Sequence, residues 1–347
     1  MVQVKTSGNI IIVMASIVII LAALKMAAAI VVPFLLASFI AIIISPLYSW
    51  LIQKKVPTVL ALLSVVGGLV IVFSLLGVIV GTSVQSFSAN MPVYEAKLHV
   101  QLSSVTEMLS RYGLLQGDLR SIFDPARLMQ YSATVLKGAG SVLTNSFIIF
   151  LIIIFMLLES TQFAKKLDTA DGERETMKHV NEVLAKIKHY MALKAVISLV
   201  TGVIVTIVLM WIGLDYAVLW GLVAFLFNFI PNIGSILAAV PAVLLALVQL
   251  GTFGAIEVGV VYLMINIVIG SIIEPRIMGE GLGISTLIVF LSLIFWGWLL
   301  GPIGMLLSIP LTIMIKIILQ TNEKTRWMAV LIGNGEGVAE AEILNDI

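Results

Sequence analysis

Long apolar runs separated by short charged stretches dominate the pattern of hydrophobic and polar positions along the chain. The uninterrupted runs cover residues 9–24, 26–46, 58–82, 141–158 and 195–213. A helix needs about 17–25 apolar residues to cross the hydrocarbon core of a bilayer. The pattern therefore predicts membrane-spanning helices, and the first two runs, which only Lys25 separates, predict a membrane hairpin.

Two charged segments carry a helical pattern instead of a continuous apolar one. In residues 83–140, apolar positions from Leu98 to Tyr112 recur at alternating spacings of four and three, on one face of a helix. Asp124-Pro125 is typical of an N-cap followed by proline in the first turn. We therefore expect two amphipathic helices outside the bilayer there. Residues 160–194 predict a further amphipathic helix, which runs directly into the next span.

Two other apolar segments, about 217–249 and about 284–319, are interrupted by proline and glycine, as in FNFIPNIGSILAAVP (227–241) and GPIGMLLSIP (301–310). Broken helices at membrane depth are tolerated only where they are buried in protein or line a watery cavity. Each half has about 14–18 residues, at or below the length that spans a membrane. The pattern favours two re-entrant hairpins, with two full crossings per segment as the alternative.

A full span precedes each broken segment: 195–213 precedes the first, and about 254–273 precedes the second. A unit made of one span and one broken segment therefore occurs twice. If both segments re-enter, the two units are inverted relative to each other, an arrangement known in secondary transporters. The sequence thus predicts a possible inverted repeat in the C-terminal third of the chain.

Lys and Arg residues set the expected orientation, because cytoplasmic loops are enriched in them. Lys54 and Lys55 lie in one loop and seven basic residues lie in 160–194, which places both loops in the cytoplasm. Both termini are then cytoplasmic. The predicted parts are N-terminal spans (1–82), extracytoplasmic helices (83–140), a span (141–159), a cytoplasmic helix (160–194), a transport core with both broken segments (195–320) and a cytoplasmic tail (321–347).

Composition strengthens this view. The chain is 60% hydrophobic and 11% charged, with a mean hydropathy of +1.14, whereas soluble domains carry about 25% charged residues. The fold class is an all-α polytopic membrane protein with about eight hydrophobic elements, solvated by the lipid bilayer. A net charge of +1 gives no sign of nucleic-acid binding. Without cysteine or a catalytic motif, we expect no enzymatic activity, no metal site and no cofactor.

Polar or helix-breaking residues inside apolar segments are the candidates for a substrate path. They are Asn228, Pro231, Asn232, Gly234, Ser235 and Asn266. The amides and the hydroxyl offer uncharged hydrogen-bonding groups beside a helix break. For Asn266, a hydrogen bond to a neighbouring helix is the alternative.

Charges near span ends are the candidates for a gate. Glu274 and Arg276 sit where Pro275 ends a helix, and an interfacial ion pair that anchors the helix end is the alternative. Glycines that suit a hinge follow at Gly279, Gly281 and Gly283. Lys194, at the end of another span, is expected to reach toward the membrane surface.

Several segments resemble the autoinducer-2 exporter family of bacterial membrane proteins, among them HYMALKAVISLVTG (189–202), FNFIPNIGSILAAVP (227–241) and the long stretch 274–312. The resemblance covers nearly the whole chain apart from the C-terminal tail. It implies the inner membrane of a bacterium, a homo-oligomer such as a pentamer, and export of autoinducer-2, a small polar quorum-sensing signal. Some relatives resemble cation/proton antiporters.

Three functions therefore stay open. The first hypothesis is an exporter of a small polar signal molecule, with both broken segments forming the path. The second is a monovalent cation/proton antiporter, which needs an intramembrane carboxylate such as Glu274 or Glu257. The third is a membrane scaffold that transports nothing and uses 83–140 for assembly.

Overall fold

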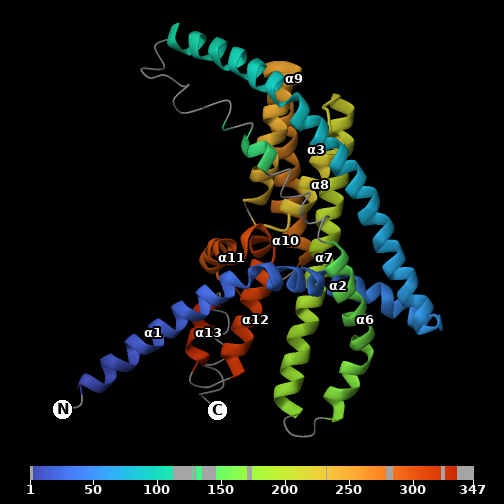
Figure 1. The fold of residues 1–347 in the computed structure, drawn as a ribbon, viewed down its shortest axis with the longest axis vertical. Coiled ribbons are helices and arrows are strands. Elements are labelled where there is room, and N and C mark those ends of the chain that lie inside the picture. Colours follow the sequence, from blue (N-terminus) through green and yellow to red (C-terminus); the bar gives the residue numbers. More distant parts are fainter. Residues whose placement is uncertain are drawn as a thin grey trace. The chain divides into compact units, whose positions relative to one another are not determined.

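A computed structural model describes residues 3–111, 127, 130–134, 146–169, 174–231, 233–278, 284–321 and 325–333. The chain divides into two compact units. Unit 1 comprises Met1–Pro46, Ile148–Val183 and Gly283–Ile347, and unit 2 comprises Leu47–Phe147 and Leu184–Leu282. Helices make up nearly all of the described part (Figure 1), where the bridge between Ile284 and Gly333 is the only strand-like pairing.

Five helices in the described ranges are long and apolar enough to cross a membrane: Ala28–Gln53, Thr58–Val100, Ile187–Ile212, Gly234–Ile277 and Thr286–Leu306. Four shorter apolar helices accompany them: Ile12–Met26, Phe147–Glu159, Ala217–Phe227 and Ser308–Gln320. The prediction of an all-α polytopic membrane protein is therefore confirmed.

Unit 1 begins with α1 (Gln3–Met26) and α2 (Ala28–Gln53), which continue in one direction (Figure 1). The amide of Ala27 donates to the carbonyl of Ala23 at 2.9 Å, and the amide of Val31 donates to that of Ala27 at 3.0 Å. The predicted hairpin between 9–24 and 26–46 is therefore wrong. Neither glycine nor proline lies at the junction, and its lysine, methionine and alanines are good helix formers.

The C-terminal part of unit 1 contains α11 (Thr286–Leu306), α12 (Ser308–Thr321) and α13 (Arg326–Ile332). The helix α6 (Ser146–Thr169) supplies most of the middle segment of unit 1. Gly301 interrupts α11 with a φ of 72°, next to Pro302. The indole nitrogen of Trp296 donates to the hydroxyl of Thr312 at 3.1 Å, so the chain folds back after this break. The second predicted interruption thus falls at Gly301.

Unit 2 contains α3 (Thr58–Arg111), a single helix of 54 residues. At 1.5 Å per residue it is about 80 Å long, well beyond the hydrocarbon core. The predicted span 58–82 and the first predicted amphipathic helix are therefore parts of one helix, with Pro92 inside it. The amphipathic helix expected after Asp124-Pro125 lies mostly outside the described residues, although 130–134 are helical.

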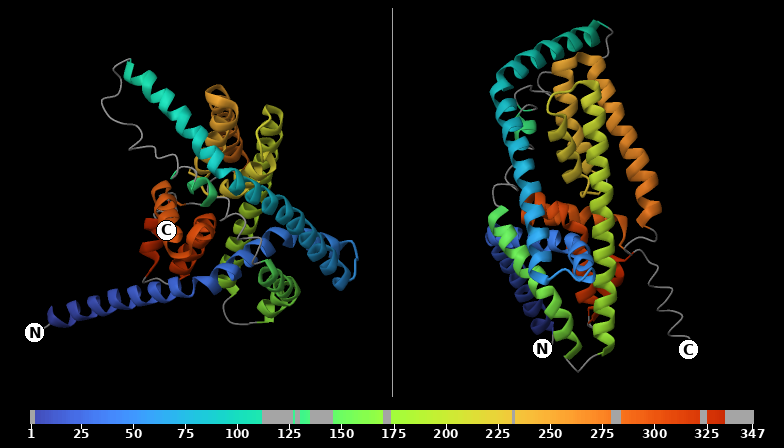
Figure 2. Two further views of the ribbon diagram at one scale, coloured as in Figure 1. Left: turned by 45° about the horizontal axis from the view of Figure 1, so that its top comes forward. Right: turned by 90° about the vertical axis from the view of Figure 1, so that its right-hand side faces the viewer.

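The rest of unit 2 is α7 (Arg174–Ile212, from residue 184 on), α8 (Ala217–Phe227), α9 (Gly234–Ile265), the π-helix η1 (Asn266–Ile273) and α10 (Glu274–Met278). Gly251 has a φ of 78° and reverses the chain inside α9, a conformation that costs glycine little. Val243 consequently faces Gly259, with its Cγ2 3.9 Å from where a Cβ of Gly259 would lie. The halves of α9 therefore run antiparallel, beside α7 and α8 (Figure 2).

The core of unit 2 is built around the fully buried Trp220 of α8. Phe87 of α3 packs edge-on against its ring, with 6.3 Å between the centroids. The indole nitrogen of Trp220 donates to the carbonyl of Asp215 at 3.1 Å. Gly202 of α7 and Gly221 of α8 let the two helices approach closely, since a Cβ on Gly202 would lie 2.7 Å from the carbonyl oxygen of Gly221.

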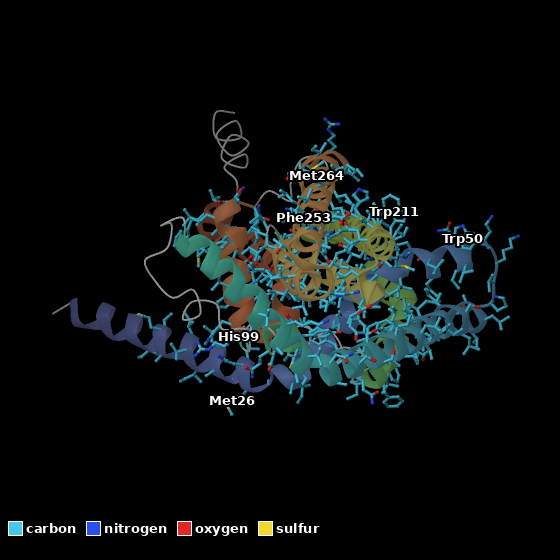
Figure 3. All side chains as sticks on the ribbon, turned by 90° about the horizontal axis from the view of Figure 1, so that it is seen from above. Met26, Trp50, His99, Trp211, Phe253 and Met264 are labelled. Atoms are coloured by element: carbon cyan, nitrogen blue, oxygen red, sulfur yellow. The ribbon has the colours of Figure 1, made fainter. Side chains whose placement is uncertain are left out.

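One end of unit 2 is defined by the side chain of Gln249. Its amide oxygen accepts from the backbone N–H of Asp215 at 2.9 Å, and its nitrogen donates to the carbonyl of Gly213 at 3.1 Å. The turn between α7 and α8 therefore lies beside the reversal at Gly251. Trp211 and Phe253, 91% and 89% exposed, flank this end (Figure 3), and tryptophan is enriched at membrane interfaces.

Candidate functional site

The first broken segment is a helical hairpin. Its first arm, α8, has 11 residues and is about 16 Å long, roughly half of the hydrocarbon thickness. Its second arm is residues 234–250. Because Gln249 contacts the turn where the hairpin begins, the segment returns to the end from which it enters.

The tip of this hairpin depends on the break that the sequence predicts. Pro231 lies half-buried in the tip, and Gly234 starts the second arm fully packed. A Cβ on Gly234 would overlap the carbonyl oxygen of Phe227 and lie 3.1 Å from the Cβ of Ile230. Any larger residue would push the arms apart, so the tip requires glycine at this position.

A pocket lies where the hairpin tip meets α7, the end of α9 and η1. It has about 290 Å³ of space, including the part that opens to solvent. Three of the predicted path residues line it: Asn228, Ser235 and Asn266. The other lining residues are Thr201, Val205, Ala224, Tyr262, Ile265, Ile269 and Gly270. Every one of the ten is uncharged, so the pocket is electrically neutral, with a few hydrogen-bonding groups in a mainly apolar wall.

The polar groups of the pocket differ in how they are satisfied. The side-chain nitrogen of Asn228 donates to the hydroxyl of Ser198 at 2.9 Å, which fixes the amide. Within the described part of the chain, the side chains of Ser235 and Asn266 make no hydrogen bond. The hydroxyl of Tyr262 is buried without a partner there. The pocket thus holds one anchored amide and three groups free to bind something else.

The pocket lies deep along the helices. At 1.5 Å per residue from the turns at the Gln249 end, Ser198, Ser235 and Asn266 lie about 20–24 Å inward. That distance is more than half of the thickness of a hydrocarbon core, which is about 30 Å. Polar groups at such a depth are costly unless they line a cavity or pair with each other.

A buried ion pair lies just beyond the pocket. The ammonium of Lys194 on α7 donates to a carboxylate oxygen of Glu274, the first residue of α10, at 2.5 Å. The two side chains are 5% and 19% exposed. Counted from the same end, they lie about 27–34 Å inward, a distance close to the thickness of a hydrocarbon core of about 30 Å.

This pairing corrects two predictions. Lys194 does not reach to the surface but is buried and paired, and the partner of Glu274 is Lys194 rather than Arg276. Arg276 is exposed. Residues two apart on a helix point in different directions, so Glu274 and Arg276 do not both face α7.

Some predicted residues cannot be placed. Asn232, Gly279, Gly281 and Gly283 lie outside the described residues, and their roles in the tip and the hinge stay predictions. Glu257, the other carboxylate considered for cation transport, is exposed on α9.

Residues that sequence reasoning missed follow simple helical spacings. Tyr262 precedes Asn266 by four residues and therefore lies on the same face. Ser198 and Thr201 follow Lys194 by four and seven residues, which gives α7 one polar stripe in an apolar span. The π-helix between Asn266 and Glu274 carries no comparable signal, although such turns occur frequently at functional sites.

A polytopic helical protein with a re-entrant hairpin and a neutral polar pocket at membrane depth has the architecture of a membrane transporter rather than of an anchor. The chain belongs to the AI-2E family of transporters, whose sequence profile matches residues 13–324. It is 40% identical to the AI-2 transport protein TqsA of Escherichia coli K12 over 329 residues, 94% of this chain and 96% of that protein. It is also 40% identical to a putative transport protein of Haemophilus influenzae over 335 residues, 93% of this chain and 95% of that protein.

Proposed function

We propose that the protein exports a small polar signal molecule, autoinducer-2, through a path that passes the tip of the α8–α9 hairpin. The observation that carries the proposal is the neutral pocket at this tip, where Asn228, Ser235 and Asn266 meet. Similarity to the E. coli AI-2 transport protein supports the choice of substrate.

The chemistry of the pocket suits such a molecule. Asn266 and Ser235 both donate and accept hydrogen bonds, as a hydroxyl-rich solute requires. Asn228, held by Ser198, presents its amide oxygen in a fixed orientation. The apolar side chains between these groups contact carbon atoms of the substrate, and a few well-placed polar groups in an apolar wall are typical of small-molecule sites.

The Lys194–Glu274 pair is the gate in this proposal. It joins α7 to the start of α10 at the inner end of the pocket, so a path to the cytoplasm requires the pair to separate or shift. The glycines at 279, 281 and 283 directly follow α10 and act as the hinge for that movement.

The test is efflux of autoinducer-2 from cells and from reconstituted vesicles, with and without a proton gradient. We expect the wild type to release the signal and Asn266→Leu to release at most a tenth as much. Asn90→Leu, an exposed asparagine on α3 outside the pocket, is the matched control. If a deletion strain distributes the signal as the wild type does, the proposal fails; if vesicles carry no solute at all, a scaffold role replaces it.

A second function, monovalent cation/proton antiport, is favoured by one observation. The carboxylate of Glu274 is largely buried beside a single lysine within the membrane region, and intramembrane carboxylates mark ion and proton pathways. Under this alternative, Glu274→Gln abolishes rescue of a salt-sensitive strain, whereas Glu257→Gln, at an exposed position, retains it.

We further propose an inner-membrane location with cytoplasmic termini and assembly as a homo-oligomer, such as a pentamer. Because the chain lacks cysteine, single cysteines placed at Lys55 and Asp215 report topology cleanly. An impermeant thiol reagent added to intact spheroplasts should label Asp215→Cys and leave Lys55→Cys unlabelled. The reverse pattern would invert the proposed orientation, and native mass spectrometry would count the subunits.

A further inference from the structure

Tyr262 carries a polar atom that the neighbouring protein groups leave unsatisfied. Its side chain is 5% exposed and lines the pocket. Its hydroxyl is buried without a hydrogen-bond partner among the described residues. A buried hydroxyl with no partner costs free energy that phenylalanine, with the same ring, would avoid. The position therefore calls for a hydrogen-bonding guest.

The other free groups of the pocket lie around the same space. Tyr262 near the end of α9 and Asn266, the first residue of η1, are four residues apart, about one helical turn. Ser235 comes from the antiparallel first half, which the reversal at Gly251 brings alongside. Two hydroxyls and one amide from two facing helices therefore line one cavity, so a single guest can contact all three.

The charge of the surroundings selects the kind of guest. Every residue that lines the pocket is uncharged. Lys194 and Glu274, the charged groups beyond its inner end, neutralise each other. An anion or a cation in the pocket would lack a counter-charge, and burying an unpaired charge is very unfavourable. An uncharged guest with several hydroxyl groups faces no such penalty and satisfies the free groups.

The size of the pocket narrows the choice further. Its space of about 290 Å³ includes open solvent, and the enclosed room is close to that of one water molecule, well below the range of about 300–1,000 Å³ for small-molecule pockets. Ile265 and Ile269 supply apolar contact for the carbon chain of a guest. A guest of a few carbon atoms therefore enters only when the lining helices separate, and the free polar groups then contact it.

We infer that Tyr262, Ser235 and Asn266 form a binding subsite for small uncharged polyols, in which the hydroxyl of Tyr262 determines specificity. The inference deepens the proposed function, because it assigns a substrate class to the same pocket. It predicts that the transporter carries polyols and excludes their phosphorylated counterparts.

The experiment measures the flux of xylitol and of glycerol 3-phosphate in vesicles that contain the full-length protein. Xylitol is the uncharged probe and glycerol 3-phosphate is the charged one. The wild type should carry xylitol at least tenfold faster than glycerol 3-phosphate. Tyr262→Phe removes only the hydroxyl, and it should lower xylitol flux about tenfold. Absent xylitol flux or equal flux of both probes overturns the inference.

The chain offers a matched control. Tyr48 on α2 also has a buried hydroxyl without a partner among the described residues, yet it does not line the pocket. Tyr48→Phe should leave xylitol flux unchanged. If Tyr262→Phe also leaves it unchanged, the hydroxyl merely holds a buried water and the inference fails. Because Tyr→Phe retains the ring, thermal unfolding should confirm that both variants are folded.

Autoinducer-2 flux in the same vesicles separates this inference from the proposed function. Tyr262-dependent xylitol flux without autoinducer-2 flux keeps the subsite and overturns the proposed substrate. Autoinducer-2 flux that is unaffected by Tyr262→Phe keeps the exporter and overturns the subsite. Loss of both fluxes in Tyr262→Phe, with the Tyr48→Phe control intact, supports the two together.

Discussion

Removal of one partner from the Lys194–Glu274 pair should destabilise the protein far more than removal of both. Lys194→Met leaves a carboxylate in a largely buried site, and Glu274→Met leaves an ammonium in a more deeply buried one. The double variant replaces the pair by two apolar side chains of similar length. Methionine is a good helix former, so helix propensity changes little in any of the three.

The magnitude follows from the burial of the two side chains. Breaking a buried ion pair by removing one partner costs about 3–5 kcal/mol, a change of about a hundredfold to a few thousandfold in the equilibrium constant between folded and unfolded protein. The Glu274 side chain retains 19% exposure against 5% for Lys194. Residual hydration therefore favours the lone carboxylate, so Lys194→Met should lie near the lower limit and Glu274→Met near the upper one. The double variant should lose about 1 kcal/mol or less, because apolar replacements of buried pairs are often neutral.

The assay is a double-mutant cycle on the protein in detergent micelles, with unfolding followed by far-ultraviolet circular dichroism. Glu257→Met, which removes an exposed carboxylate from α9, is the control and should change stability little. If the effects of the single changes add to within about 0.5 kcal/mol in the double variant, the two side chains do not interact and the gate assignment fails.

Three further changes test the hairpin and the pocket. Gly234→Ala should destabilise the protein strongly in thermal unfolding, because the new Cβ would overlap the carbonyl oxygen of Phe227. The control is Gly81→Ala, whose Cβ would have no atom within 4 Å. It should be neutral or stabilising by about 1 kcal/mol. Gly251→Ala should cost about 1–2 kcal/mol of stability in the same measurement, because the φ of 78° at this position suits glycine. A variant with unchanged stability would contradict the chain reversal at Gly251. Asn228→Leu should lower transport at unchanged expression, and full transport would remove Asn228 from the site.

The hairpin could be predicted because its cause is local. Pro231 and Gly234 break the helix within a few residues, and the first arm, with 11 residues, is too short to cross the membrane. The turn at Gly251 likewise falls in the gap that the apolar pattern leaves between the first broken segment and the following span. In each case a proline or glycine marks the place where the chain changes direction, and sequence reasoning detects such residues directly.

The ion pair and the first helices could not be predicted in the same way. Lys194 and Glu274 are 80 residues apart, and their meeting depends on how α7 packs against the end of η1. A lysine at the edge of an apolar run is normally taken to mark the membrane boundary, and only the position of Glu274 shows that Lys194 is paired instead. The expected hairpin between α1 and α2 relied on Lys25 alone as a break, yet lysine is a good helix former and the hydrogen bonds continue past it.

The likeness of the two broken segments has a physical basis. A Cβ on Gly234 would overlap the carbonyl oxygen of Phe227, and a Cβ on Gly304 would overlap that of Trp296. Each glycine also lies against the Cβ of the residue four positions earlier, at 3.1 Å and 2.7 Å respectively. The matching parts of IGSILAAVP and IGMLLSIP therefore share one local feature, a glycine that lets the returning chain lie against a carbonyl oxygen of the preceding arm.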